Sequence, residues 1–161
     1  MRDVSGLDIF NYQLSPEETI IREKAFKCIL EGIPATPHYL RQITGMPHEQ
    51  IKVTVDKLAR SGMLVVDSES GNVVGSHGLS LVETPHRLHI KGNDLFTWCA
   101  IDAVGIPSAL KVDAQINSTC FTCQKKLTIE LINGQIVYSS EPNIQLWLVE
   151  ADLGRSMVGC T

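Results

Sequence analysis

The spacing of apolar residues in the first half of the chain predicts three helices followed by a β-hairpin. The first helix begins with Ser15 as its N-cap and Pro16 at its first helical position, followed by acidic residues that suit the positive end of the helix dipole. This order of elements is typical of a winged helix-turn-helix. The expected helices and strands lie, in chain order, at 16–30, 38–43, 48–61, 64–66 and 72–74.

The second half of the chain contains short runs rich in apolar residues, a pattern that predicts strands. Between two of these runs, the Asn-Gly pair at 133–134 is a strong signal for a two-residue hairpin turn. One helix is expected over 95–104, capped by Asp94 and ended by the Gly-Ile-Pro sequence at 105–107. The expected strands lie at 79–82, 87–90, 111–116, 126–132, 135–138 and 145–150.

These elements together predict an α+β fold with two parts. An N-terminal winged helix-turn-helix-like unit of three helices would cover residues 1–78. A mainly antiparallel β-sheet domain, with one helix that carries the candidate site, would cover residues 79–161. The chain has 161 residues, of which 43% are hydrophobic, and this is enough to bury a core in one domain or in two small ones.

Charge argues against nucleic acid as the partner of the N-terminal unit. The whole chain has a net charge of −4, and residues 1–64 contain eight Lys or Arg against eight Asp or Glu. DNA binding draws most of its affinity from cationic side chains that contact phosphate, and this segment has no excess of them. We therefore expect a structural or gating role for the unit, with a metal-responsive winged-helix regulator as the alternative.

Cysteine content and hydropathy predict a cytoplasmic protein with reduced thiols. No apolar run approaches the ~20 residues that span a bilayer, and the first residues lack the apolar segment of a signal peptide. The five cysteines are an odd number, which argues against a disulfide scaffold and leaves thiols available as metal ligands or nucleophiles. Cys28 follows the apolar period of the first helix, so we expect it to be buried as a small apolar residue.

The stretch from Leu95 to Asp102 holds the most informative pair of residues. Cys99 and Asp102 are three positions apart, so on the expected helix they would share a face. A thiolate binds a soft metal ion and an adjacent carboxyl can carry a proton, so the pair could combine metal capture with proton transfer. A buried cysteine beside a solvated aspartate is the alternative.

The sequence Trp-Cys-Ala-Ile-Asp at 98–102 resembles the active-site segment of the organomercurial (alkylmercury) lyase family. The similarity extends from about residue 16 to the end of the chain and includes the expected winged helix-turn-helix. Cys120 stands where the family carries a cysteine that is regarded as structural. The other matching segments are Gly-Leu-Ser-Leu-Val-Glu-Thr-Pro-His at 78–86, Ser-Thr-Cys at 118–120, and the approach to Cys160 at 155–160.

This resemblance implies an enzyme of detoxification that cleaves a carbon–metal bond by protonolysis. Cys99, Asp102 and Cys160 would form a soft-metal site. In it, Cys99 and Cys160 would hold the metal as thiolates, and Asp102 would handle the proton that the departing carbon requires. The substrate would be an organometallic small molecule, with Hg(II) or another soft metal as the bound ion and no organic cofactor. The products would be a hydrocarbon and a bis-thiolate Hg(II) complex, which cellular thiols, a metal reductase or an efflux system would accept.

The end of the sequence departs from the family pattern. Family members continue past the second cysteine, whereas this sequence ends at Thr161, one residue after Cys160. The open explanations are a truncated chain, a shorter branch of the family, translation that stops at a selenocysteine codon, and a Cys160 that only captures metal.

The Cys-x-x-Cys formed by Cys120 and Cys123 is a second departure. The pair could bind zinc with two further ligands, for which His77, His86 and His89 are candidates, or it could relay metal to the candidate site. Otherwise Cys120 is structural and Cys123 incidental. Both departures favour a second function, a soft-metal (Hg or Cu) binding or delivery protein on the same scaffold without turnover.

Overall fold

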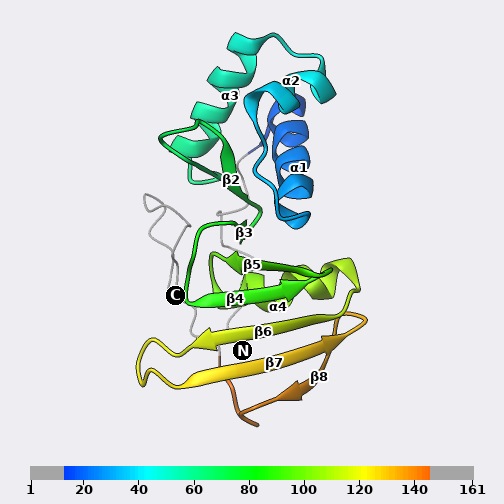
Figure 1. Cartoon of the computed structure of the whole chain (residues 1–161), viewed down its shortest axis with the longest axis vertical. Helices are drawn as coiled ribbons and strands as arrows, with labels where there is room; N and C mark the ends of the chain where they lie inside the picture. Colours follow the sequence, from blue (N-terminus) through cyan, green and yellow to red (C-terminus); the bar gives the residue numbers. More distant parts are fainter. Residues whose placement is uncertain (1–12, 146–161) are drawn as a thin grey trace.

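The computed structural model describes residues 13–145, which form an antiparallel sheet with helices packed on it (Figure 1). Helices α1 (Pro16–Leu30), α2 (Pro37–Thr44) and α3 (His48–Arg60) come first and pack together at one end of the molecule. Ser15 caps α1 as expected, because its hydroxyl accepts from the Glu18 N–H at 3.3 Å while the Glu18 carboxylate accepts from the Ser15 N–H at 2.8 Å. The three helices predicted from periodicity are confirmed.

The eight strands of the described residues form one sheet in the order β1-β2-β3-β5-β4-β6-β7-β8, and every neighbouring pair is antiparallel. The predicted α+β class with a mainly antiparallel sheet is confirmed. The strand expected at 145–150 lies, apart from Gln145, outside the described residues. The strands are β1 (Leu64–Val66), β2 (Val73–Ser76), β3 (Leu79–Ser80), β4 (His86–Ile90), β5 (Asn93–Thr97), β6 (Ala114–Thr119), β7 (Lys126–Ile132) and β8 (Gln135–Ser139).

The hairpin predicted at the Asn-Gly pair joins β7 to β8. Asn133 has a φ of 50° and Gly134 a φ of 75°, and positive φ at both central residues is what a type I′ turn requires. Ile132 and Gln135 face each other directly across the turn. Local turn chemistry therefore sets the register of the last hairpin in the described chain.

Residues 93–97 form strand β5, so the helix expected over 95–104 is wrong in its first part. The cause is a second two-residue turn, in which Lys91 (φ 52°) and Gly92 (φ 81°) fold β4 back onto β5. Asp94 caps no helix. Its carboxylate instead pairs across the hairpin with Arg87 at 3.0 Å and with His89 at 3.1 Å.

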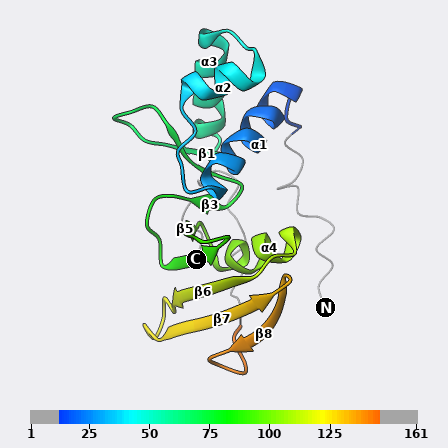
Figure 2. The same ribbon diagram turned by 45° about the vertical axis from the view of Figure 1, so that its right-hand side comes forward.

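Helix α4 (Ala100–Leu110) begins later and ends later than the sequence predicted. It continues through the Gly-Ile-Pro sequence at 105–107 and stops where Lys111 adopts a left-handed conformation with φ 53°. Pro107 cannot donate a backbone hydrogen bond, but it is buried in a helix that packs against β4, β5 and β6 (Figure 2). We infer that this packing offsets the lost bond.

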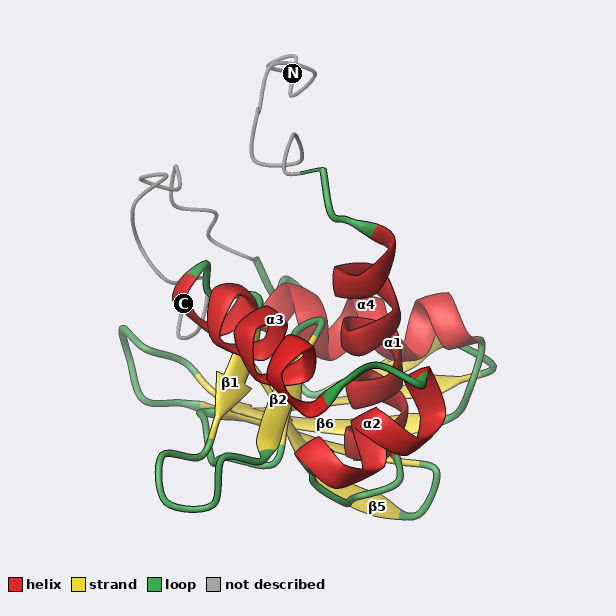
Figure 3. Ribbon diagram, turned by 90° about the horizontal axis from the view of Figure 1, so that it is seen from above, coloured by secondary structure: helices red, strands yellow, loops and turns green. Residues whose placement is uncertain are grey.

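The core lies between the helices and the sheet, and Figure 3 shows the helices from above with the strands beneath them. Cys28 on α1 is only 4% exposed, which confirms its prediction as a buried residue. Two polar contacts tie α1 to the sheet: the Ser76 hydroxyl donates to the carbonyl of Arg22 at 3.0 Å, and the Asn93 amide donates to that of Leu30 at 3.0 Å. None of the described helices combines the length and apolarity needed to cross a membrane.

Candidate active site at the start of helix α4

Cys99 is the N-cap of α4, and Asp102 occupies the third position of the helix. The Cys99 thiol donates to Oδ2 of Asp102 at 3.1 Å, and the backbone N–H of Asp102 donates to the Cys99 sulfur at 3.5 Å. The two side chains therefore meet, but through N-cap geometry rather than through the shared helix face that the sequence suggested. Asp102 also lies near the positive end of the helix dipole.

Burial controls the proton affinity of both groups. Loss of solvation, and to a lesser degree the adjacent Asp102 carboxylate, raise the pKa of Cys99 to about 11 against the opposing effect of the Asp102 N–H. The pKa of Asp102 is also raised, again chiefly by burial, although its contact with Cys99 opposes the shift. In the free protein the pair therefore retains the thiol proton, which lies between the sulfur and the carboxylate.

We expect the alkylation rate of Cys99 by iodoacetamide to rise about tenfold per pH unit from about pH 7 to about pH 10 without levelling off, because only the thiolate reacts. Cys120 is the internal control, since the nearby N–H of Cys123 lowers its pKa and its rate should level off within that range. Peptide mass spectrometry would follow each cysteine, with circular dichroism to verify the fold at every pH. A Cys99 rate that levels off below about pH 9 would contradict the raised pKa.

Gly78 brings the β2–β3 turn against the carboxyl of Asp102. Its φ is +82°, and a Cβ at this position would lie 2.3 Å from both Cγ and Oδ1 of Asp102. The Gly78 carbonyl accepts from the Trp98 N–H at 2.8 Å, which joins this turn to the end of β5. Only glycine allows this approach. Sequence reasoning noted Gly78 merely as the start of a strand region, although the turn it forms is a common role for glycine.

His86, at the start of β4, is a buried neighbour of the pair that sequence reasoning considered only as a zinc ligand. Its side chain is 5% exposed, and Nδ1 lies 3.0 Å from the Ser118 hydroxyl on β6. Its Nε2 has no hydrogen-bond partner among the described residues. Burial lowers the pKa of His86, and the charge of Asp102 opposes that shift. His86 and Asp102 are thus electrostatically linked although they come from a strand and a helix.

The junction between β5 and α4 is held by side chains on both sides of Cys99. The Thr97 hydroxyl donates to the carbonyl of Cys99 at 3.0 Å, and the Thr84 hydroxyl donates to the carbonyl of Thr97 at 2.7 Å. Trp98 is 4% exposed, as expected for a core or pocket-wall residue. These contacts fix the backbone from which the thiol projects.

The remaining predicted site residues do not join this pair within the described chain. Cys160 lies outside the described residues. Cys120 and Cys123 lie on the turn between β6 and β7, where Cys120 is half-buried and Cys123 exposed. Within residues 13–145, no three His, Cys, Asp or Glu side chains are grouped as metal ligands, so the zinc site considered for this pair with His77, His86 or His89 is not formed there.

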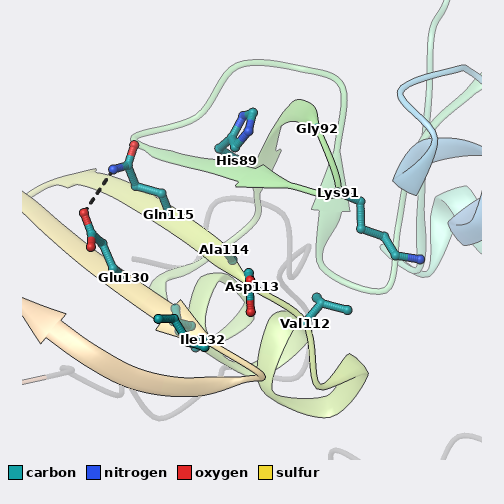
Figure 4. Close-up of a pocket in the computed structure, with 10 residues that line it drawn as sticks. His89, Lys91, Gly92, Val112, Asp113, Ala114, Gln115, Glu130 and Ile132 are labelled. Carbon is teal, nitrogen blue, oxygen red and sulfur yellow. Dashed lines mark hydrogen bonds between the residues drawn. The ribbon is translucent and has the colours of Figure 1, made fainter.

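Two surface hollows differ in their relation to the site. One, of about 500 Å³, lies over β4, β6 and β7, where Gln115 and Glu130 are hydrogen-bonded at 3.3 Å, and neither Cys99 nor Asp102 lines it (Figure 4). The other, of about 300 Å³, lies between α1 and α4 and is lined by Glu23, Phe26, Lys27, His77, Ile106, Ala109 and Leu110. Of these two hollows, only the second is lined by His77, the residue that precedes Gly78.

The site is a partly buried thiol hydrogen-bonded to a carboxyl, at the start of a helix packed on an antiparallel sheet. A thiol is a ligand for thiophilic metal ions, and a carboxyl beside it is suited to proton transfer. The family model for alkylmercury lyase (MerB) matches residues 79–161, which is more than half of the chain. The chain belongs to the alkylmercury lyase family.

Individual relatives are similar over much of this chain. The alkylmercury lyase of Staphylococcus epidermidis is 32% identical over 117 residues, which are 73% of this chain and 51% of the relative. That of Bacillus cereus is 34% identical over 112 residues, or 70% and 49% of the two chains. A crystal structure of the mercury-bound form of MerB2 matches with a TM-score of 0.75 and 29% identity, over 80% of this chain and 62% of that chain. The chain spans about half the length of the curated relatives that it matches.

Proposed function

We propose that this chain cleaves the carbon–mercury bond of organomercurials by protonolysis. The observation that carries the proposal is the 3.1 Å contact between the Cys99 thiol and Oδ2 of Asp102, which puts a soft-metal ligand and a proton carrier side by side. Membership of the alkylmercury lyase family supports the same chemistry. Mercury belongs to the substrate, and no organic cofactor enters the proposed reaction.

Capture begins when the Cys99 sulfur replaces a ligand X on the mercury of a substrate R–Hg–X. The sulfur–mercury bond forms, X leaves with its bonding electrons, and the thiol proton moves to the adjacent Asp102 carboxylate. Because burial raises the pKa of Asp102, the carboxyl can hold this proton beside the metal-bound carbon. The site thus stores the proton that cleavage needs.

Cleavage follows when the electron pair of the carbon–mercury bond takes the proton from Asp102 and R–H departs. We assign the second thiolate to Cys160, which keeps Hg(II) bound to two sulfurs and gives up its own proton. Of the two thiol protons that enter, one ends on carbon and one leaves with X. When protonated, His86 would favour the Asp102 carboxylate that remains, since the imidazolium charge lowers the pKa of Asp102.

We place this reaction in the cytoplasm, as a step of mercury detoxification. Bound Hg(II) would leave the protein by exchange onto cellular thiols, or onto the thiols of a metal reductase or an efflux system. All four described cysteines are free thiols, which supports a reducing setting for the protein.

The direct test is release of methane from methylmercury or of benzene from phenylmercury by the wild-type chain with excess thiol, measured by headspace gas chromatography. Release well above that of the thiol buffer alone supports a lyase. No release, together with tight binding of Hg(II), would reject turnover and leave the second candidate, a soft-metal binding or delivery protein. The two thiols on the β6–β7 turn favour that candidate.

We also propose that residues 1–78 act as a winged-helix-like scaffold and residues 79–161 as the lyase part. The order of α1, α2, α3 and the β1–β2 hairpin supports the comparison with a winged helix. Of the cationic residues on α3, Lys57 forms an ion pair with Glu18 of α1 at 2.5 Å, so its charge is partly neutralised within the N-terminal unit. A structural role is therefore favoured over a metal-responsive DNA-binding role.

Replacing Gly78 by alanine should reduce hydrocarbon release at least about tenfold, because the new Cβ would force the Asp102 carboxyl away from the Cys99 thiol. The positive φ should also cost about 1 kcal/mol of unfolding free energy. Gly92→Ala is the matched control, since Gly92 has a φ of +81° but no atom within 4 Å of the added Cβ. The control should lose stability and keep activity. Equal activity loss in both variants would show that strain, and not the contact with Asp102, is responsible.

A further inference from the structure

The two cysteines of the β6–β7 turn take no part in the reaction proposed above. β6 ends at Thr119 and β7 begins at Lys126, and these two residues pair directly across the sheet. The six residues between them contain both Cys120 and Cys123. This connection is short and lies outside the helix that Cys99 caps. Two thiols on it therefore suggest a function separate from that of Cys99.

Backbone hydrogen bonds hold the turn in one shape. The Cys120 N–H donates to the carbonyl of Lys125 at 2.9 Å, and the Gln124 N–H donates to the carbonyl of Cys120 at 2.9 Å. Gln124 has a positive φ of 57°, and its side chain donates to the carbonyl of Phe121 at 2.8 Å. The turn therefore keeps the two cysteines close, with the Cys123 side chain exposed to solvent.

Polar groups of the turn lie close to the Cys120 sulfur. The backbone N–H of Cys123, its side chain and the N–H of Thr122 all lower the pKa of Cys120. The Lys125 ammonium, which is paired with Glu141 at 2.5 Å, also lies within electrostatic reach of Cys123.

We propose that Cys120 and Cys123 form a dithiol site for a two-coordinate thiophilic metal ion, namely Hg(II). Binding replaces two S–H bonds by two S–Hg bonds and releases two protons to solvent, with no change of oxidation state. Zinc would need two further ligands, and none is grouped with the pair within residues 13–145. The proximity of the two thiols does not depend on the proposed function, whereas the choice of Hg(II) rests on it.

The turn leaves the sheet next to the candidate active site. Ser118, two residues before Cys120, lies 3.0 Å from His86, which is electrostatically linked to Asp102. His86 and Ser118 pair where β4 begins and β6 ends, so an ion that leaves the site by thiol exchange would find a second pair of sulfurs near the same end of the sheet. We assign the pair as a holding site for the metal product before external thiols take it.

The test uses the full chain with Cys99→Ser and Cys160→Ser, so that the proposed lyase thiols are absent. The protein is fully reduced and titrated with Hg(II) in the absence of oxygen, against glutathione as competitor, and bound mercury is counted by native mass spectrometry. We expect one equivalent of Hg(II) in this background and in the added control variant Thr122→Ser. Adding Cys123→Ser should weaken retention against glutathione at least about tenfold, because one of the two metal–thiolate bonds is lost.

Two results would overturn the proposal: a reduced background protein that retains no Hg(II), or full retention after Cys123→Ser. If the background variant does not fold, Hg(II) should instead protect Cys120 and Cys123 of the wild-type chain from iodoacetamide, and lack of protection would overturn the site equally. Failure of the lyase proposal looks different, since a wild type that releases no hydrocarbon can still hold Hg(II) at this turn.

Discussion

Replacing Cys99 by serine should abolish hydrocarbon release from phenylmercury, with a loss of at least about 1,000-fold in turnover, because the nucleophile that captures mercury is removed. The fold should survive. Serine is close to cysteine in volume and is a favoured N-cap, so the hydroxyl can take over the contact that the sulfur makes with the Asp102 N–H. Gas chromatography and thermal unfolding measured on the same sample would separate loss of chemistry from loss of structure.

Cys28→Ala is the matched control for this variant. Cys28 is buried in α1 and makes no contact with the candidate site, so its removal should leave cleavage unchanged apart from a small loss of stability. Persistent cleavage in Cys99→Ser would reject Cys99 as the capturing thiol. The same loss in Cys28→Ala would show that general damage to the fold, rather than removal of one sulfur, stops the reaction.

Changing Asp102 to asparagine should slow protonation of the leaving carbon about 100- to 1,000-fold, the range expected for loss of a general acid. Mercury capture also loses its proposed proton acceptor, but it should slow less than protonation, because solvent can take the thiol proton and asparagine keeps the side-chain shape and the backbone N–H that contacts the Cys99 sulfur. Single-turnover experiments separate the two steps: capture is followed as the mass of the R–Hg adduct on the protein, and protonation as released hydrocarbon. The adduct should accumulate in this variant.

Asp94→Asn supplies the control, since Asp94 is an exposed carboxylate paired with Arg87 and His89 at the far end of the β4–β5 hairpin. It should behave as the wild type in both steps. A parallel fall of capture and protonation in Asp102→Asn would mean that Asp102 only holds the start of α4 in place. Rapid hydrocarbon release by that variant would mean that the proton comes from another group.

The sequence predicts features that depend on neighbouring residues better than features that depend on residues far apart in the chain. The capping box at Ser15 and the Asn-Gly turn at 133–134 are local, and both form as expected. The turn at Lys91-Gly92 uses the same local chemistry, but a capping interpretation of Asp94 competed with it and was wrong. Its carboxylate is satisfied across the hairpin, by partners that are neighbours only after folding.

The residues of the candidate site also differ in how far their contacts could be predicted from the sequence. Cys99 and Asp102 are close in sequence, so their meeting could be predicted even though the helix begins five residues later than expected. His86 and Gly78 reach Asp102 from separate strands and turns, and nothing in their local sequence indicates that approach. The sheet order that brings them together is a property of the whole chain.

The shortest strand has a consequence for how the molecule can be divided. β3 is two residues long, yet it pairs with β2 on one side and with β5 on the other, and Gly78 directly precedes it. A fragment that begins at Leu79, where the match to the family model starts, would lack the carbonyl that receives the Trp98 N–H and the backbone that lies against Asp102. We therefore expect that the segment matched by the family model, taken alone, would not keep the arrangement of the candidate site.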